Sequence, residues 1–324
     1  MNREKILVTY PLPMEGLQDL KQKFEVIRYK EYSIPRSNLL YSILDCAGVL
    51  AAMVNVDEEL MDAAPKLKII SVYGSGYDNV DVKAATERGI LVTNIPDAVT
   101  DSTAELTIGL MLNVMRRISE FDRKLRQKDS FSWGRANIFG HVLHDKELGI
   151  VGMGRIGRAV AKRASAFGMR ISYYNRKRLD PVIEMELGVA YKRFDDLLKA
   201  ADVISIHTPL NKETRHLIGE RELSMMKSSA YLINTSRGAV IDEKALVRHL
   251  MEGKLAGAGL DVYEEEPIIP PELLKLDNVV LTPHIGTDTF ETHLQMTRES
   301  AQNIIDFFNG RHPFHAVNPQ VFRE

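Results

Sequence analysis

The sequence lacks the features that mark disulfide-rich, nucleic-acid-binding or membrane-spanning proteins. With one cysteine, Cys46, it can form no internal disulfide, which suits a reducing compartment, and we expect this thiol to be buried among apolar side chains. The net charge of −2 offers no basic field for nucleic acid or an anionic membrane. No apolar run is long enough to span a bilayer, and the N-terminus shows no signal peptide. We therefore expect a cytoplasmic protein that binds neither nucleic acid nor membrane.

What the sequence does contain is a regular alternation of strand-like and helix-like segments. Its length of 324 residues favours two domains. Short apolar runs separated by helical periodicity predict an α/β protein with parallel sheets covered on both faces. The predicted strands cover residues 5–10, 24–29, 48–54, 68–73, 90–92, 148–151, 170–174, 202–207, 230–235, 256–261 and 278–282.

Two predicted helices are unusually long. The first begins near residues 102–105, which fit a capping box, and its apolar positions continue to Leu125, about seven turns further on. Such a helix either crosses between domains, packs against another subunit or lies in a core. The second covers residues 290–308 and ends at Asn309 and Gly310. One economical arrangement inserts a nucleotide-binding domain in the middle of the chain and builds the other domain from both chain ends.

The most informative segment is residues 148–157, an apolar strand that ends in Gly-x-Gly-x-x-Gly. Gly152 permits a tight turn, Gly154 lets the backbone approach a pyrophosphate, and Gly157 lets the next helix pack closely on the strand. The N-terminus of that helix offers amide groups and a positive dipole end to phosphate oxygens. Because a helical segment and the strand 170–174 follow, the motif predicts dinucleotide binding rather than a merely structural turn.

Three charged residues, Arg237, Glu266 and His284, directly follow predicted strands. Each has a plainer interpretation, because Arg237 could lie on the surface, Glu266 is one of three consecutive glutamates, and a histidine after a strand is often structural. However, the carboxyl ends of neighbouring parallel strands are where α/β proteins commonly hold their chemistry. The shared position therefore favours one common site.

Several motifs, in order over nearly the full chain, resemble the D-2-hydroxyacid dehydrogenase family, specifically its glyoxylate/hydroxypyruvate reductase branch. They are Val151-Gly152-Met153-Gly154-Arg155-Ile156-Gly157, His207-Thr208-Pro209-Leu210, Asn234-Thr235-Ser236-Arg237-Gly238, Gly259-Leu260-Asp261-Val262 through Glu266-Pro267, and Thr282-Pro283-His284-Ile285-Gly286. The resemblance implies two Rossmann-like, doubly wound parallel-sheet domains with the active site in the cleft between them. It implies a flavodoxin-like substrate-binding domain of residues 1–99 plus 288–324, a dinucleotide-binding Rossmann domain of residues 100–287, and a homodimer.

By this resemblance Arg237, Glu266 and His284 are the catalytic residues of a reductase of small 2-oxo acids, and the chemistry explains the residue types. Reducing a 2-oxo acid requires a hydride at the carbonyl carbon and a proton at its oxygen. Protonated His284 would supply the proton, and Glu266 would raise the pKa of the imidazole. The guanidinium of Arg237 would hold the substrate carboxylate or 2-oxo oxygen and stabilise developing negative charge.

The first domain is expected to complete the substrate site. Tyr73, Gly74, Ser75 and Gly76 follow a predicted strand, and their backbone amides could bind a carboxylate, although an ordinary tight turn is the alternative. Asn55 also follows a strand and is a weaker candidate. In related reductases a tryptophan reaches the neighbouring subunit's site, and Trp133 either does so here or only packs in an interface.

The segment after strand 170–174 bears on the choice of cofactor. NAD-binding sites commonly place Asp or Glu about 20 residues after the glycine motif, where it binds the ribose 2′-hydroxyl. Here the position is Asn175, and Arg176, Lys177 and Arg178 follow. This basic cluster would attract a 2′-phosphate, so we expect NADP(H) to be preferred and NAD(H) to be possible, unless the cluster is only a solvated charge run.

The resemblance extends the cofactor site to further residues, and we expect no metal. They are Thr103, Arg155, Ile156, His207, Thr208, Pro209, Thr214, Thr235, Ser236, Arg237, Asp261, His284 and Gly286.

Other functions remain open at this stage. A reductase of 2-ketogluconate or another D-2-hydroxyacid dehydrogenase fits the same motifs, because loops set the substrate length. The basic cluster argues against an NAD-dependent phosphoglycerate dehydrogenase. A dinucleotide-sensing scaffold similar to some transcriptional corepressors is the non-enzymatic alternative, and the intact catalytic set favours an enzyme.

Overall fold

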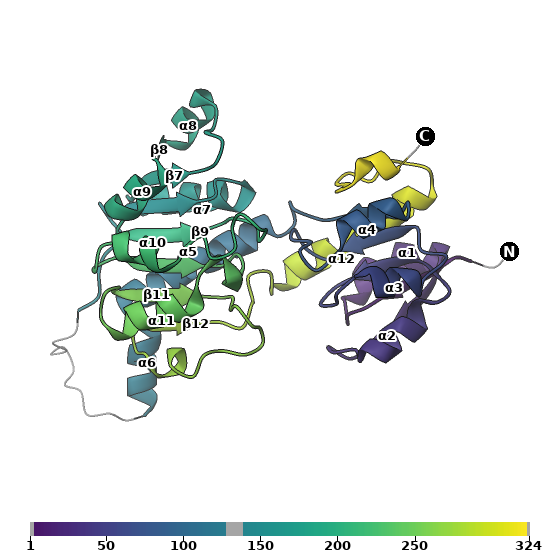
Figure 1. The fold of residues 1–324 in the computed structure, drawn as a ribbon, viewed down its shortest axis with the longest axis horizontal. Helices are drawn as coiled ribbons and strands as arrows, with labels where there is room; N and C mark the ends of the chain where they lie inside the picture. The colour runs from purple at the N-terminus through teal and green to yellow at the C-terminus, as the bar shows by residue number, and fades with distance from the viewer. Residues whose placement is uncertain (1–2, 128–138, 323–324) are drawn as a thin grey trace. The chain divides into compact units, whose positions relative to one another are not determined.

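The computed structural model describes residues 3–127 and 139–322, and the chain divides into two compact units (Figure 1). Unit 1 combines residues 1–99 with residues 287–324, and unit 2 consists of residues 100–286. Within the described ranges, we find no helix that is both long enough and apolar enough to cross a membrane.

Unit 1 is built on a five-stranded sheet in which every neighbouring pair is parallel, in the order β2-β1-β3-β4-β5. The strands are β1 (Lys5–Val8), β2 (Glu25–Arg28), β3 (Cys46–Ala51), β4 (Ile69–Val72) and β5 (Leu91–Thr93). Cys46 is fully buried in this sheet, and burial raises the pKa of its thiol to about 11. The expected apolar environment of this cysteine is confirmed.

Helices cover both faces of the sheet in unit 1. One apolar core lies beneath α2 (Arg36–Ile43), α3 (Glu58–Asp62) and α4 (Val82–Glu87), and a second beneath α1 (Gln18–Lys23) and α12 (Phe290–Phe308). The C-terminal helix α12 packs on β4, and Ser71 Oγ donates to the Ser300 carbonyl at 3.0 Å. The end of the chain therefore completes the core of unit 1.

Unit 2 contains a seven-stranded, wholly parallel sheet in the order β12-β11-β10-β9-β6-β7-β8. From β6 the chain winds outward to β8, then returns to the other side of β6 and continues from β9 to β12. The strands are β6 (Glu147–Val151), β7 (Arg170–Tyr174), β8 (Val189–Tyr191), β9 (Val203–Ile206), β10 (Tyr231–Asn234), β11 (Gly257–Leu260) and β12 (Val279–Leu281). The predicted α/β fold with two doubly wound parallel sheets is confirmed.

The two faces of this sheet carry different helices. The helices α5 (Thr100–Arg116) and α7 (Arg155–Ala166) cover one face, with an apolar core between them and the sheet. The helices α9 (Phe194–Ala200), α10 (Glu220–Met225) and α11 (Glu243–Met251) cover the other face over a second apolar core. The helix α8 (Pro181–Leu187) lies next to β8 at the sheet edge. With both faces covered, the carboxyl edge of the sheet is left for ligands.

The prediction of one long helix from Ser102 is wrong in two respects. The helix begins at Thr100, and the side chain of Glu105, expected to close a capping box, pairs instead with Arg163 at 3.3 Å. It also ends at Arg116, and α6 (Ile118–Arg126) is a separate helix. The break is at Arg117, whose φ of 57° is left-handed and interrupts helical hydrogen bonding.

A second difference is the short strand β8, which had not been predicted. It is only three residues long and lies at the sheet edge, with Ala190 exposed between a buried and a half-buried neighbour. The equally short strands β5 and β12 were predicted because each lies in a run of large apolar residues, whereas β8 has the small, exposed Ala190 at its centre and therefore lacks such a run.

Candidate active site

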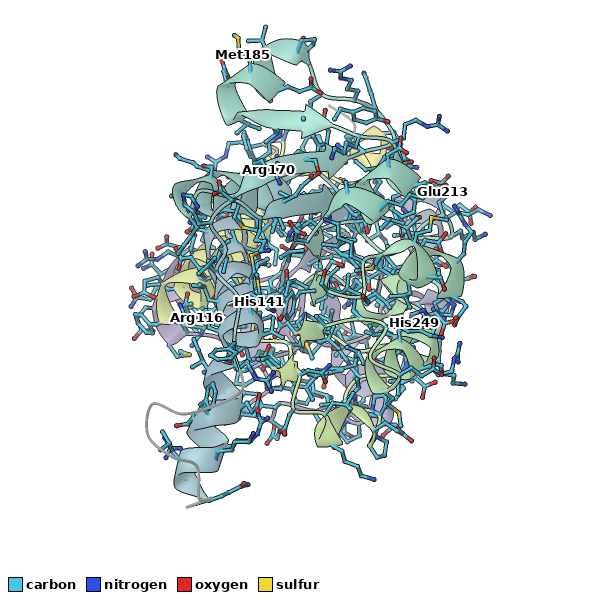
Figure 2. All side chains as sticks on the ribbon, turned by 90° about the vertical axis from the view of Figure 1, so that its left-hand side faces the viewer. Arg116, His141, Arg170, Met185, Glu213 and His249 are labelled. Atoms are coloured by element: carbon cyan, nitrogen blue, oxygen red, sulfur yellow. The ribbon has the colours of Figure 1, made fainter. Side chains whose placement is uncertain are left out.

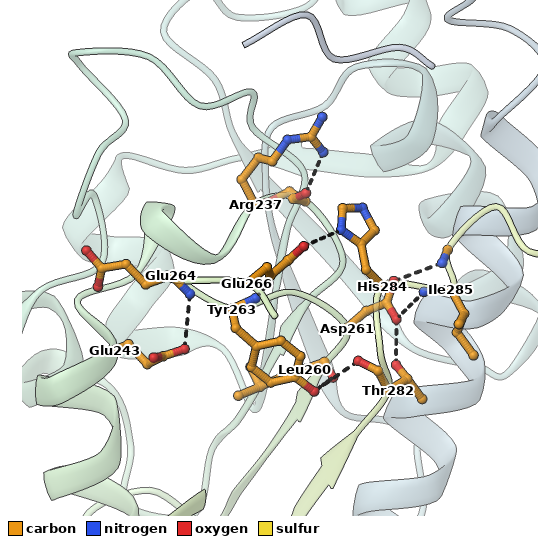
Figure 3. A network of polar contacts seen from close by, with 12 residues as sticks. Arg237, Glu243, Leu260, Asp261, Tyr263, Glu264, Glu266, Thr282, His284 and Ile285 are labelled. Carbon is orange, nitrogen blue, oxygen red and sulfur yellow. Dashed lines mark hydrogen bonds and ion pairs between the residues drawn. The ribbon is translucent and has the colours of Figure 1, made fainter. Parts of the chain in front are cut away.

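The predicted catalytic residues come together because their strands are neighbours. Arg237 follows β10, Glu266 lies in the segment after β11, and His284 follows β12, and these three strands are adjacent in the sheet of unit 2. Parallel strands present their carboxyl ends at the same edge, so the three side chains meet there (Figure 3).

His284 and Glu266 form a hydrogen-bonded ion pair. Nδ1 of His284 lies 2.8 Å from Oε2 of Glu266, and the backbone N–H of Tyr263 donates to the other carboxylate oxygen at 3.0 Å (Figure 3). The side chain of His284 is 42% exposed, and its second ring nitrogen, Nε2, has no partner among the residues of ranges 3–127 and 139–322. The imidazole is therefore oriented by Glu266 through one nitrogen and accessible to a ligand through the other.

The pair favours the charged form of both groups. For His284, the hydrogen bond to Glu266 is the largest influence and raises its pKa against the opposing effect of burial. For Glu266, burial alone would raise the pKa, but the hydrogen bond and charge of His284 outweigh it, so this pKa lies below its ordinary value. The result is an imidazolium that persists to higher pH than a free histidine.

Asp261 supports the loop that carries His284. Asp261 is 1% exposed, and its carboxylate accepts hydrogen bonds from Thr282 Oγ1 at 2.6 Å and from the backbone N–H groups of Ile285 at 2.8 Å and Gly286 at 2.9 Å. Its carbonyl accepts from the N–H of His284 at 2.8 Å. These contacts fix a residue whose φ of 56° is uncommon for a non-glycine. Asp261, predicted as a cofactor contact, thus serves the chain's own loop.

Asn234 holds the loop that carries Arg237. Asn234 is fully buried at the end of β10, its amide donates to the Arg237 carbonyl at 3.0 Å, and its Oδ1 accepts from the N–H and hydroxyl of Ser236. A Cβ on Gly238 would collide with the backbone of Tyr263, so the two loops are in close contact. No role was predicted for Asn234 from the sequence, although it lies in the motif Asn234-Thr235-Ser236-Arg237-Gly238. The available signal was a polar residue at the end of an apolar strand.

The glycine loop follows β6 and has the geometry of a phosphate cradle. A Cβ on Gly152, whose φ is 100°, would lie 2.6 Å from the His207 carbonyl oxygen, and a Cβ on Gly157 would collide with the Gly152 carbonyl. By contrast, nothing lies within 4 Å of the Cβ position of Gly154, which caps α7. Close packing at two glycines and open space at the third are what a bound pyrophosphate requires.

A buried hydroxyl beside this loop also fits a ligand. Thr208 Oγ1 is buried without a hydrogen-bond partner in the part of the chain that the structure describes, and its backbone nitrogen would lie 3.0 Å from a Cβ on Gly152. Buried hydroxyls are nearly always hydrogen-bonded, so an orphaned one next to the glycine loop indicates room for a polar ligand group. The residues present therefore fit a dinucleotide.

Other predicted cofactor residues already have partners within unit 2. His207 Nε2 lies 2.8 Å from Ser205 Oγ, and the packing around its ring lowers its pKa, although part of the residue is accessible. Thr214 Oγ1 donates to the Pro209 carbonyl at 2.6 Å. Of the remaining residues, Thr235 shares a hydrogen bond with Thr107 through its hydroxyl at 2.8 Å, and Thr103 Oγ1 lies 3.5 Å from the Cβ position of Gly286. Arg155 and Pro209 are exposed.

The side chains of residues 175–178, which follow β7, differ in their hydrogen-bond and ion-pair partners. Asn175 Oδ1 accepts from the N–H of Met153 in the glycine loop at 2.8 Å. Arg178 makes two hydrogen bonds to the buried carboxylate of Glu184, at 2.9 and 2.7 Å. Arg176 is paired with Glu213, and Lys177 is exposed without an ion-pair partner in the described ranges. Arg178 is held by a buried carboxylate, whereas the partner of Arg176 is exposed, which leaves Arg176 and Lys177 as candidates for a 2′-phosphate.

Of the predicted substrate residues, Asn55 and residues 73–76 lie in unit 1. Tyr73 directs its hydroxyl to α12, with His293 Nδ1 at 2.9 Å, and burial raises its pKa to about 12. Gly74 and Ser75 accept hydrogen bonds through their carbonyls from Ile95 and Asn94, and Gly76 is half-buried in the same turn. The predicted residue Asn55 is exposed and accepts from Arg36 through its carbonyl at 3.0 Å, whereas Trp133 lies outside the described residues. Among the described residues, no group of three or more His, Cys, Asp or Glu side chains could hold a metal ion.

Comparison with known proteins gives a consistent result. Residues 108–286 match the model of the D-isomer specific 2-hydroxyacid dehydrogenase, NAD binding domain. The chain is 47% identical to a glyoxylate reductase of Thermococcus litoralis over 98% of both chains. It also resembles the crystal structure of a glyoxylate reductase from Paecilomyes thermophila, with a TM-score of 0.89 and 38% identity over 99% of this chain and 100% of that one.

A further solved structure bears on the cofactor. It is an NADPH-dependent glyoxylate/hydroxypyruvate reductase from Sinorhizobium meliloti in complex with NADP and malonate, with a TM-score of 0.88 and 33% identity over 100% of this chain and 99% of that one. Full-length similarity at these identities, together with the paired histidine and glutamate and the glycine loop, establishes the family. The chain belongs to the D-isomer specific 2-hydroxyacid dehydrogenases and is an NAD(P)-dependent oxidoreductase.

Proposed function

We propose that this oxidoreductase reduces small 2-oxo acids, namely glyoxylate and hydroxypyruvate, to 2-hydroxy acids, with NADPH preferred over NADH. The observation that carries the proposal is the 2.8 Å contact between His284 and Glu266, which keeps a proton donor charged. Arg237, whose guanidinium can bind a carboxylate, lies near enough to influence the pKa of His284. Relatives described as glyoxylate reductases support the substrate class. Where the product carbon is chiral, we expect the D isomer.

Each catalytic side chain has a defined task in this proposal. The bound nicotinamide would supply the hydride. Protonated His284 donates the proton from Nε2 to the carbonyl oxygen, and Glu266 keeps the imidazole charged and oriented through Nδ1. Arg237 binds the substrate carboxylate or 2-oxo oxygen and stabilises the negative charge that develops on oxygen. In the oxidative direction neutral His284 is the base.

The preference for NADPH is argued from charge. Gly154, the N-terminus of α7 and Thr208 would hold the pyrophosphate side of the cofactor, and Arg176 and Lys177 would bind the 2′-phosphate. The amide of Asn175 stands where an acidic residue commonly selects NAD. NADH stays a possible cofactor because no group at this position excludes a 2′-hydroxyl.

Two further proposals complete this function. The backbone amides of Ser75 and Gly76 contribute to binding the substrate carboxylate, whereas that of Gly74 already donates to the Val72 carbonyl at 3.0 Å. The protein forms a homodimer, to which Trp133 contributes. Sizing chromatography at micromolar concentration tests the dimer, and a monomer mass would contradict it.

The test is a matrix of initial rates, followed by the loss of reduced-cofactor absorbance. NADPH and NADH are each compared against glyoxylate, hydroxypyruvate and 2-ketogluconate at matched concentrations. We expect faster turnover with NADPH on the two smaller acids. Arg237→Ala should abolish most of this activity, whereas Arg248→Ala, which removes an exposed arginine on α11, should not. Turnover restricted to 2-ketogluconate, or none at all, would contradict the proposal.

A further inference from the structure

An ion pair spans the carboxyl edge of the sheet in unit 2. Arg176 follows β7, Glu213 lies in the turn after β9, and β6 is the strand between them in the sheet. The guanidinium of Arg176 is nevertheless paired with the carboxylate of Glu213. Because the glycine loop begins at the end of β6, the pair reaches across the segment that binds the cofactor in doubly wound folds.

Both partners stand on segments that are held in place. The N–H of Glu213 donates to Asn211 Oδ1 at 2.9 Å, and the neighbouring Arg215 is paired with Glu264 at 3.0 Å. On the other side, Asn175 is anchored to the glycine loop. The side chains of Arg176 and Glu213 are themselves 74% and 66% exposed, and Glu213 lies at the surface of unit 2 (Figure 2). A ligand can therefore reach both groups without rearranging the backbone.

The two side chains favour different groups on the ribose. A guanidinium binds a phosphate through two parallel hydrogen bonds, whereas a carboxylate repels a phosphate and accepts a hydrogen bond from a ribose hydroxyl. A 2′-phosphate must therefore take Arg176 away from Glu213. A 2′-hydroxyl leaves the ion pair intact. Since Asn175 supplies no negative charge after β7, Glu213 is placed to supply one from the loop after β9.

We propose that Glu213 is a determinant of cofactor choice, which limits the preference for NADPH over NADH by competing with the 2′-phosphate for Arg176. This inference rests on the proposed function, because it assumes that unit 2 binds a nicotinamide dinucleotide at its glycine loop. It differs from that proposal in assigning a selective role to an acidic residue outside the basic segment.

The first test measures nucleotide binding to the full chain by titration calorimetry, without substrate. The probes are 2′,5′-ADP and 5′-AMP, which differ only in the 2′-phosphate. Glu213→Gln should tighten binding of 2′,5′-ADP relative to 5′-AMP by about fivefold, the size of one exposed charge pair. Glu252→Gln, which removes another exposed glutamate, paired with Lys254, is the matched control and should leave the ratio unchanged.

A double-mutant cycle with Arg176→Gln identifies the route of the effect. In the Arg176→Gln background, Glu213→Gln should improve the ratio less than in the parent protein, because only the direct repulsion of the phosphate is relieved and there is no guanidinium left to release. An effect that persists in full would overturn the proposal that Glu213 acts through Arg176. An unchanged or weakened preference for 2′,5′-ADP in Glu213→Gln alone would also overturn it.

The outcomes separate this inference from the proposed function. If the parent protein binds both nucleotides but Glu213→Gln does not change their ratio, the inference is wrong and the proposed cofactor site stands. If the parent binds neither nucleotide, both are wrong. With glyoxylate, Glu213→Gln should raise kcat/KM for NADPH relative to NADH through KM, since His284 and Arg237 are untouched.

Discussion

For single residues, the protonation of His284 is influenced by charged groups that follow two neighbouring strands, β10 and β11. Glu266 raises its pKa through a hydrogen bond, Asp261 adds to this by its negative charge, and Arg237 opposes it by its positive charge. Because the pKa of His284 is raised, the imidazolium is present at low pH and is lost only as the pH rises through that raised value. Reduction that uses His284 as acid should follow the same curve.

Replacing Glu266 tests this dependence. Glu266→Gln removes the carboxylate that raises the pKa of His284, so kcat/KM for reduction should fall at lower pH than in the parent protein. The measurement is a pH profile of kcat/KM with saturating cofactor. Glu265→Gln changes an exposed neighbour and should leave the profile in place. A pH profile identical in Glu266→Gln and the parent would refute the role assigned to Glu266.

His284→Ala should lower kcat by about 10²- to 10⁴-fold, the contribution expected from a general acid.

Gly238 has no side chain that could react, but its close packing on Tyr263 positions the neighbouring Arg237. Gly238→Ala places a methyl group against the backbone of Tyr263, so the loop that carries Arg237 must move. We expect a loss of about 1–3 kcal/mol in the free energy of unfolding and a fall in kcat/KM of about 100-fold. Gly109→Ala in α5, where nothing lies within 4 Å, is the control and should not destabilise the protein. Thermal melts and initial rates measure both effects, and equal behaviour of the two variants would contradict the close contact.

Among the elements, the turn from β6 into α7 contains glycines that are needed for packing and one that is free to face a ligand. Gly157 is needed because the Gly152 carbonyl occupies the space of its side chain, whereas Gly154 faces open space. The same glycine motif therefore contains positions that serve the fold and a position that serves a ligand. The helix pair α5 and α6 shows the opposite case, in which apolar periodicity continues across Arg117 although the helix does not.

The two glycines predict different consequences of one substitution. Gly154→Ala should weaken binding of NADPH and 2′,5′-ADP while changing the free energy of unfolding by less than about 1 kcal/mol, because only a helix cap is affected. Gly157→Ala should instead destabilise unit 2, since the methyl group meets a backbone carbonyl. Titration calorimetry and chemical denaturation distinguish the two. Undiminished nucleotide binding by Gly154→Ala would argue against the phosphate cradle.

At the scale of the whole molecule, the C-terminal helix belongs to unit 1, although it follows unit 2 in the chain. Ile304 of α12 is fully buried in the core that includes Ile69 and Leu91. Stability of unit 1 therefore depends on the last segment of the sequence, and nucleotide binding by unit 2 does not draw on those contacts.

Truncating Ile304 tests this division. Ile304→Ala should lower the free energy of unfolding by about 2–5 kcal/mol, as expected for a fully buried isoleucine. Gln302→Ala, on the exposed side of the same helix, should change it by less than about 0.5 kcal/mol. Below the unfolding transition, Ile304→Ala should bind 2′,5′-ADP as the parent does. A large loss of affinity would show that the two units depend on each other.

The sequence alone predicts the α/β class, eleven of the strand positions and the helix at residues 290–308, because buried parallel strands are short apolar runs and amphipathic helices repeat apolar residues every three to four positions. It also indicated Arg237, Glu266 and His284, since their chemistry and their place after strands are local features. The short strand β8 and the break at Arg117 were not predicted, because β8 lacks the run of large apolar residues that marks β5 and β12, and the break depends on one backbone angle.

Only the tertiary structure decided which charged groups are paired. Arg176, Lys177 and Arg178 are equivalent in sequence, yet Arg178 is bound to Glu184 and Arg176 to Glu213, which follow six and 37 positions later. The buried amide of Asn234 and the carboxylate of Asp261 were likewise given their tasks by the loops that fold around them. The physical reason is that hydrogen bonds and ion pairs depend on distances of a few ångströms between segments, and sequence spacing does not set those distances once the chain leaves a regular element.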